Sequence, residues 1–172
     1  MRVTYETQKL SLRFFMLMLV LFGLQVVYGM ILAAQQADPS LLAGVINFTV
    51  ARASHLNLAV LWIVCGFVGS ALFVTPLLAK RDVVAPWLVH LLFYAVIAIV
   101  IWNLGTQFLA QTGVAGWAGG QPWLQNGLEY IEMGRAAAVG VLVGFLILAF
   151  VVLKTFPPMR QWNEIHWGLG LG

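Results

Sequence analysis

Four long apolar runs without a charged side chain constrain this sequence more than any other feature. They cover residues 14–34, 56–79, 85–109 and 136–153. A helix that crosses the hydrocarbon core of a bilayer needs about 20 mostly apolar residues, and backbone inside lipid must satisfy its own hydrogen bonds. The sequence therefore predicts an all-α polytopic membrane protein, with four transmembrane helices in a single domain over residues 1–172.

Composition excludes the other broad classes of protein. Hydrophobic residues make up 62% of the chain and charged residues 9%, whereas a soluble domain has roughly 45–50% and about 25%. The lone cysteine, Cys65, excludes an intrachain disulfide and a multi-cysteine zinc site. The nine Lys and Arg are scattered without a basic run, so the sequence predicts no nucleic-acid partner.

The placement of Lys and Arg predicts the orientation in the membrane. If the N-terminus is cytoplasmic, seven of the nine lie on the inner side: Arg2, Lys9, Arg13, Lys80, Arg81, Lys154 and Arg160. The other two, Arg52 and Arg135, lie outside. Cytoplasmic segments carry the excess of Lys and Arg, so we expect both termini to be cytoplasmic. The loop over residues 110–134 is then on the outer side and the tail over residues 156–172 on the inner side.

His55 is the most informative polar residue. It lies at the outer end of the second run, and Arg52 precedes it by one helical turn on roughly the same face. A neutral imidazole there suits an axial ligand of haem iron, and a guanidinium suits a haem propionate. The alternative from spacing alone is an interfacial His and Arg that contact water and headgroups.

Two further histidines are weaker candidates. His90 lies near the inner end of the third run, roughly 25–30 Å below His55 at 1.5 Å per helical residue. One iron cannot take both as axial ligands. A haem on His55 would therefore need its second ligand from another chain. His90 is interpreted as a packed or interfacial residue and His166, in the tail, as solvated.

A pair of acids ends the outer loop. Glu129 and Glu132 are three residues apart and share a face if this stretch is helical. Carboxylate oxygens suit a hard cation such as Ca²⁺, and acids at this surface also suit proton entry. The alternative is an ordinary helix start, where acids favour the positive end of the helix dipole. In the fourth run, Gly140 and Gly144 allow close approach of another helix, from this chain or another.

Four segments resemble the large subunit of bacterial nitric oxide reductases, and one of them, residues 22–25 (FGLQ), is similar to the middle of the family's helix one. Residues 48–62 are FTVARASHLNLAVLW, and the family has a pattern close to FNVAR-x-x-H-x-N-L-x-x-x-W in its second helix. Residues 5–9 (YETQK) are similar to its Y-E-S-Q-K start of helix one, and residues 127–132 (GLEYIE) to its G-x-E-[YF]-x-[ED] segment before helix four. The likeness runs in order from residue 3 to about 156. We therefore expect the first four helices, about a third, of such a subunit of the haem-copper oxidase superfamily.

The resemblance implies roles for the candidate residues. His55 matches the outer axial ligand of a low-spin haem b, and Arg52 an arginine near the haem propionates. Glu129 and Glu132 match acidic residues linked to a bridging calcium and to proton entry from outside. The family's other haem ligands and its non-haem iron ligands lie on later helices. We thus expect no catalytic residue in this chain and a second membrane subunit that supplies them.

The expected function is a membrane subunit of a split nitric oxide reductase-like respiratory complex in the bacterial inner membrane. This chain alone would not be an enzyme, and its complex would take electrons from cytochrome c or a quinol. One alternative is a structural or assembly subunit of a respiratory complex without its own cofactor. Another is the matching piece of a cbb3-type oxidase, whose pattern is closer to R-x-x-H-T-N, so Leu56 and the glutamate segment count against it.

Overall fold

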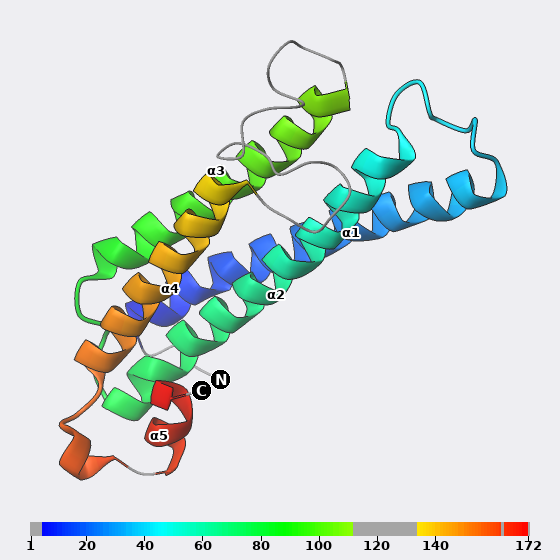
Figure 1. Ribbon diagram of the computed structural model, residues 1–172. Coiled ribbons are helices and arrows are strands. Elements are labelled where there is room, and N and C mark those ends of the chain that lie inside the picture. The colour runs from blue at the N-terminus through cyan, green and yellow to red at the C-terminus, as the bar shows by residue number, and fades with distance from the viewer. Residues whose placement is uncertain (1–4, 112–133, 163, 172) are drawn as a thin grey trace.

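The chain folds into a bundle of long helices (Figure 1). The computed structural model describes residues 5–111, 134–162 and 164–171. Four helices are long and apolar enough to cross a membrane: α1 (Glu6–Ala37), α2 (Phe48–Ala79), α3 (Pro86–Gln111) and α4 (Arg135–Thr155). A short 3₁₀ turn, η1 (Met159–Gln161), and a helix, α5 (Glu164–Leu171), follow. The described residues form no strand, and the predicted all-α class with four spanning helices is confirmed.

The first two helices are longer than the apolar runs predicted. Each has 32 residues, which is about 48 Å at 1.5 Å per residue, against about 30 Å of hydrocarbon. The helices begin at Glu6 and Phe48 rather than at residues 14 and 56. The apolar runs mark only the part suited to lipid, and the polar turns before them are helical because their backbone N–H groups are capped. Asn47 caps α2, and its side chain accepts a hydrogen bond from Val50 N.

One end of the bundle is closed around the turn between α2 and α3. The Asp82 side chain accepts hydrogen bonds from the backbone N–H of Thr7 (3.0 Å) and of Glu6 (3.4 Å), and from the Thr7 hydroxyl (2.8 Å). Asp82 therefore caps the start of α1 from 75 residues further along the chain. The sequence analysis did not identify this cap.

The same turn also holds the end of α4. Arg81 Nε donates to the carbonyl oxygen of Thr155 and its guanidinium to that of Lys154, both at 3.0 Å. The Thr155 hydroxyl accepts from Val84 N at 3.0 Å. We call this the turn end: residues 6–7, 80–85 and 154–155. The hydrogen bonds of this turn show that α1 begins and α4 ends on the same side of the bundle (Figure 1).

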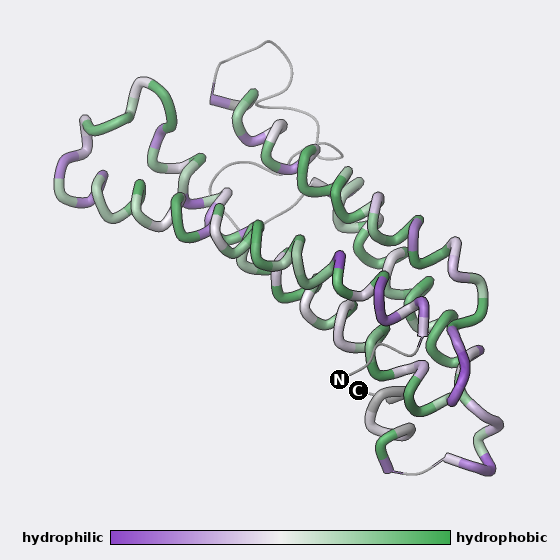
Figure 2. The backbone as a smooth tube through the Cα atoms, turned by 180° about the vertical axis from the view of Figure 1, so that it is seen from behind, coloured by the Kyte–Doolittle hydropathy of each residue, from purple (hydrophilic) through white to green (hydrophobic). Residues whose placement is uncertain are grey.

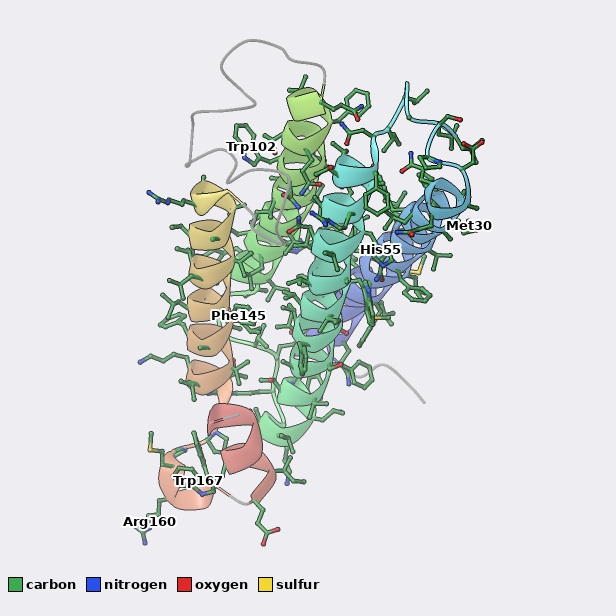
Figure 3. The ribbon with its side chains drawn as sticks, turned by 45° about the vertical axis from the view of Figure 1, so that its right-hand side comes forward. Met30, His55, Trp102, Phe145, Arg160 and Trp167 are labelled. Carbon is green, nitrogen blue, oxygen red and sulfur yellow. The ribbon has the colours of Figure 1, made fainter. Side chains whose placement is uncertain are left out.

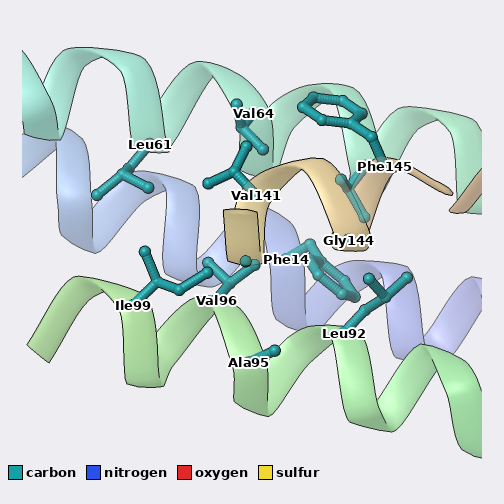
Figure 4. Close-up of a pocket in the computed structure, with 12 residues that line it drawn as sticks. Phe14, Leu61, Val64, Leu92, Ala95, Val96, Ile99, Val141, Gly144 and Phe145 are labelled. Atoms are coloured by element: carbon teal, nitrogen blue, oxygen red, sulfur yellow. The ribbon is translucent and has the colours of Figure 1, made fainter. Parts of the chain in front are cut away.

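The helices pack as two antiparallel pairs, α1 with α2 and α3 with α4, joined mainly through α2 and α3. The glycines of α4 are used within the chain: a Cβ on Gly140 would meet Ile99 at 3.1 Å, and one on Gly144 would meet Leu92 at 3.6 Å. A small apolar pocket lies between the helices at this level, lined by Phe14, Leu61, Ile99 and Gly144 among others (Figure 4). The sequence left open whether the helix that approaches these glycines belongs to this chain or to another. In the structure it is α3 of the same chain.

Helix α1 leaves most of its apolar surface outside this bundle. Only 6% of its most apolar 18-residue window is buried, compared with 39% for α2. Hydrophobic colour follows the long helices in Figure 2. Such a surface suits lipid or further transmembrane helices.

Candidate functional site

The imidazole of His55 is held against α1. Its Nδ1 lies 2.9 Å from the backbone carbonyl oxygen of Gln25, and the ring is half-buried. A carbonyl oxygen only accepts hydrogen bonds, so Nδ1 carries the proton in the neutral ring. That leaves the lone pair on Nε2, which has no hydrogen-bond partner among the described residues. Figure 3 shows His55 on α2 beside α1, far from Trp167 at the other end of the molecule.

A glycine on α1 makes room for the ring. Gly29 lies one helical turn after Gln25, and a Cβ built on it would come within 3.0 Å of His55 Cε1 and 3.3 Å of His55 Nδ1. Contacts this close are tighter than most real Cβ contacts, so the imidazole would have to shift by a few tenths of an ångström to admit even a Cβ here. The Gln25 side chain also accepts a hydrogen bond from Trp62 Nε1, two turns of α2 beyond His55. The sequence analysis assigned no role to Gln25 or Gly29, because their contact with His55 depends on the register between two helices.

Arg52 lies one turn before His55 on α2 and is also half-buried. A different face of the same α2 segment carries buried polar residues. Ser54 donates a hydrogen bond to Gln107 of α3 at 2.7 Å, and Asn57 is 0% exposed. We call this part of the molecule, residues 25–29, 52–57 and 103–107, the His55 end. Here α2 contacts α1 with one face and α3 with another.

Sequence similarity to known proteins extends over nearly the whole length of this chain. Residues 9–169 match the family described as cytochrome c and quinol oxidase polypeptide I. The chain belongs to this family. It is also similar to a subunit of the nitric oxide reductase of Stutzerimonas stutzeri, with 29% identity over 146 residues. That alignment covers 83% of this chain and 31% of the relative, so the chain spans about a third of the relative's length. The predicted resemblance is confirmed.

The donor set at His55 fits the haem that members of this oxidase family bind. Among the described residues no three His, Cys, Asp or Glu side chains come together, as a metal ion held by side chains alone would need. The iron of haem already has four porphyrin nitrogens and needs only axial ligands from the protein. A single imidazole with a fixed Nδ1 proton and a free Nε2 meets that need.

The other predicted residues of this oxidase-family chain lie elsewhere. His90 is in the first turns of α3, which begins at the turn end, so it lies at the opposite end of the bundle from His55. His166 lies in α5, beyond α4. Glu129 and Glu132 lie outside the described residues, as does most of the predicted outer loop. The structure brings His55 and Arg52 together and separates both from His90.

Proposed function

We propose that this chain is a membrane subunit of a split nitric oxide reductase-like complex, in which His55 is one axial ligand of a low-spin haem b. The observation that supports this most directly is the seating of the imidazole. Gln25 fixes the Nδ1 proton, Gly29 leaves space for the ring, and Nε2 remains available to iron. When bound, the haem supplies an iron that gains and releases one electron.

The second axial ligand comes from another chain in this proposal. The chain has three histidines. The 24 residues of α2 from His55 to Ala79 rise about 36 Å, and α3 returns about 6 Å from Pro86 to His90, so His90 lies about 30 Å from His55 along the bundle. The partner subunit also carries the catalytic iron ligands, so no residue of this chain is catalytic. Its remaining helices cover apolar surface of α1 that this bundle leaves open. Arg52, one turn from His55, holds a haem propionate through its guanidinium.

The His55 end faces the outside of the bacterial inner membrane in this proposal. The turn end carries Lys80, Arg81 and Lys154, with Lys9 beside it, whereas Arg52 and Arg135 lie toward the other end. This segregation is typical of a cytoplasmic turn end. Electrons reach the complex from cytochrome c or a quinol.

Glu129 and Glu132 serve calcium binding and proton entry on the outer side. Replacing either carboxylate by the amide removes the charge that a hard cation prefers while it keeps the shape. Glu129→Gln should lower the calcium content of the complex or slow its proton-coupled turnover, with haem content unchanged. Unchanged calcium and turnover in both the Glu129→Gln and Glu132→Gln variants would contradict this role.

The proposal is tested by purifying the tagged chain from membranes of the organism that makes it. We expect the chain to copurify with a second membrane subunit and with haem b, detected by pyridine haemochrome. Produced without that subunit, it should hold little haem or aggregate in detergent. A monodisperse monomer with a full complement of haem would overturn the split-complex proposal.

A further inference from the structure

A short chain of buried amides crosses from α2 to α3 at the His55 end. The Ser54 hydroxyl donates to Gln107 Oε1 at 2.7 Å, and Gln107 Nε2 donates to Asn103 Oδ1 at 3.3 Å. All three side chains are buried, as is Asn57 three residues after Ser54. Together with Asn57, these residues place four buried polar side chains at this end of α2 and α3.

Two atoms of this network have no partner among the described residues. Asn57 Nδ2 donates to the Ala53 carbonyl at 2.8 Å, but Asn57 Oδ1 accepts nothing. Asn103 Oδ1 is used by Gln107, but Asn103 Nδ2 donates to nothing. Asn57 is 0% exposed and Asn103 3% exposed, so bulk water does not satisfy either group. Buried polar atoms left in this way are costly and are normally paired.

The register of α2 against α3 puts the two atoms at one level of the bundle. Ser54 contacts Gln107, and the two helices are antiparallel (Figure 1). Moving three residues along α2 from Ser54 reaches Asn57, and moving four residues back along α3 from Gln107 reaches Asn103. At 1.5 Å per residue these steps are about 4.5 and 6 Å in the same direction. One turn further along, Leu61 and Ile99 line the apolar pocket, so packing is incomplete beside this level (Figure 4).

We propose that Asn57 and Asn103 bind one buried water molecule between α2 and α3. A water accepts from Asn103 Nδ2 and donates to Asn57 Oδ1, which extends the hydrogen-bonded chain from Ser54 through to Asn57. The chemistry selects water over an ion. A cation needs acceptors and an anion needs donors, whereas this site offers one of each and no charged side chain belongs to the network. Buried waters typically make two to four such bonds.

Solid-state NMR of the full chain in lipid bilayers, together with the subunits that copurify with it, tests the site. The chain has five asparagines, at 47, 57, 103, 126 and 163, so selective labelling of asparagine keeps the side-chain amide signals few. In a water-edited spectrum we expect magnetisation transfer from water to Asn103 Nδ2 but not to the buried backbone N–H of Leu58. Asn57→Leu should abolish the transfer to the unchanged Asn103, because the water loses its acceptor.

Thr75→Val is the matched control. Thr75 is a buried polar residue of α2 at the other end, and its hydroxyl bonds within its own helix to Ala71. This variant should keep the water signal at Asn103. Absence of transfer to Asn103 in the unmodified chain, or its persistence in Asn57→Leu, would overturn the proposal.

A double-mutant cycle gives a second measurement that does not need the NMR assignment. Asn57→Leu and Asn103→Leu should each lower the midpoint of thermal unfolding, because each leaves the other amide unsatisfied. The double variant should lose less than the sum of the two, since it leaves neither group behind. Strictly additive losses would contradict a shared ligand. If a single variant does not fold, the water transfer in the unmodified chain decides.

Discussion

The two ends of the bundle are built on opposite plans. At the turn end two charged side chains close helix termini: Asp82 caps the start of α1, and Arg81 caps the end of α4 by donating to its last carbonyl groups. At the His55 end the polar groups lie inside helices rather than at termini. There Nε2 of His55, Oδ1 of Asn57 and Nδ2 of Asn103 all lack partners among the described residues.

The comparison separates residues that stabilise the fold from residues that have the capacity to bind a ligand. Satisfied caps contribute stability and leave nothing for a ligand to bind. Buried groups with spare hydrogen-bonding or ligating capacity cost stability and persist where something else completes them. Substitutions at the turn end should therefore change stability alone, whereas substitutions at the His55 end should also change what is bound.

The largest expected effect comes from filling the space beside His55. A Cβ at residue 29 would already lie 3.0 Å from the imidazole, and Gly29→Val adds two further carbon atoms, so the ring must shift away from its place against α1. We expect the complex to lose most of its low-spin haem absorption while the chain still inserts in the membrane. Pyridine haemochrome and a reduced-minus-oxidised spectrum measure the loss.

Gly23→Val is the matched control on the same helix, because a Cβ at Gly23 meets nothing within 4 Å. It should keep the haem. Equal haem content in both variants would mean that the packing of His55 on α1 does not matter for the ligand.

The next effect is a loss of stability at the turn end. Asp82→Ala removes the cap of α1 and should lower the free energy of unfolding by about 1 kcal/mol, the usual value of an N-cap. Haem content per folded molecule should stay normal, in contrast to Gly29→Val. Denaturant titration followed by circular dichroism measures the change. A haem loss without a stability loss would reverse the assignment of the two ends.

The cap should also depend on pH. Partial burial raises the pKa of Asp82, but hydrogen bonds from Thr7 and Glu6 and the charge of Lys9 outweigh it and hold the pKa below the ordinary value of 3.8. A lowered pKa in the folded state means that the contribution is complete above about pH 4 and is lost as pH falls through the folded pKa. Asp82→Asn should flatten this acid dependence. Glu164→Gln, in the exposed first turn of α5, is the control, and an equal flattening there would contradict a special role for Asp82.

The smallest effect is expected from an exposed ion pair beside the cap. Lys9 Nζ lies 2.6 Å from Glu6 Oε1, with side chains 59% and 77% exposed. Such pairs contribute about 0–1 kcal/mol. Lys9→Met should therefore destabilise the chain less than Asp82→Ala in the same titration. A larger loss would show that the turn end depends on surface charge rather than on the Asp82 cap.

Sequence alone predicted the parts of this molecule that one helix determines. Four apolar runs are sufficient for four spanning helices, and the spacing of Arg52 and His55 is sufficient to place both at one end of α2. The partners of His55 were not predictable in this way. Gln25 and Gly29 face the ring only because α1 and α2 pack in one particular register, and Asp82 caps a helix that begins far from it in sequence. Glu129 and Glu132 remain predictions.

The most direct measurement is the reduced-minus-oxidised spectrum of the purified complex with His55→Leu and His90→Leu side by side. Leucine removes the donor nitrogen and roughly keeps the volume. The proposed ligation predicts that His55→Leu loses the low-spin band while His90→Leu, at the opposite end of the bundle, keeps it. A normal low-spin band in His55→Leu, or a band lost only in His90→Leu, would contradict the assignment of His55 as the axial ligand.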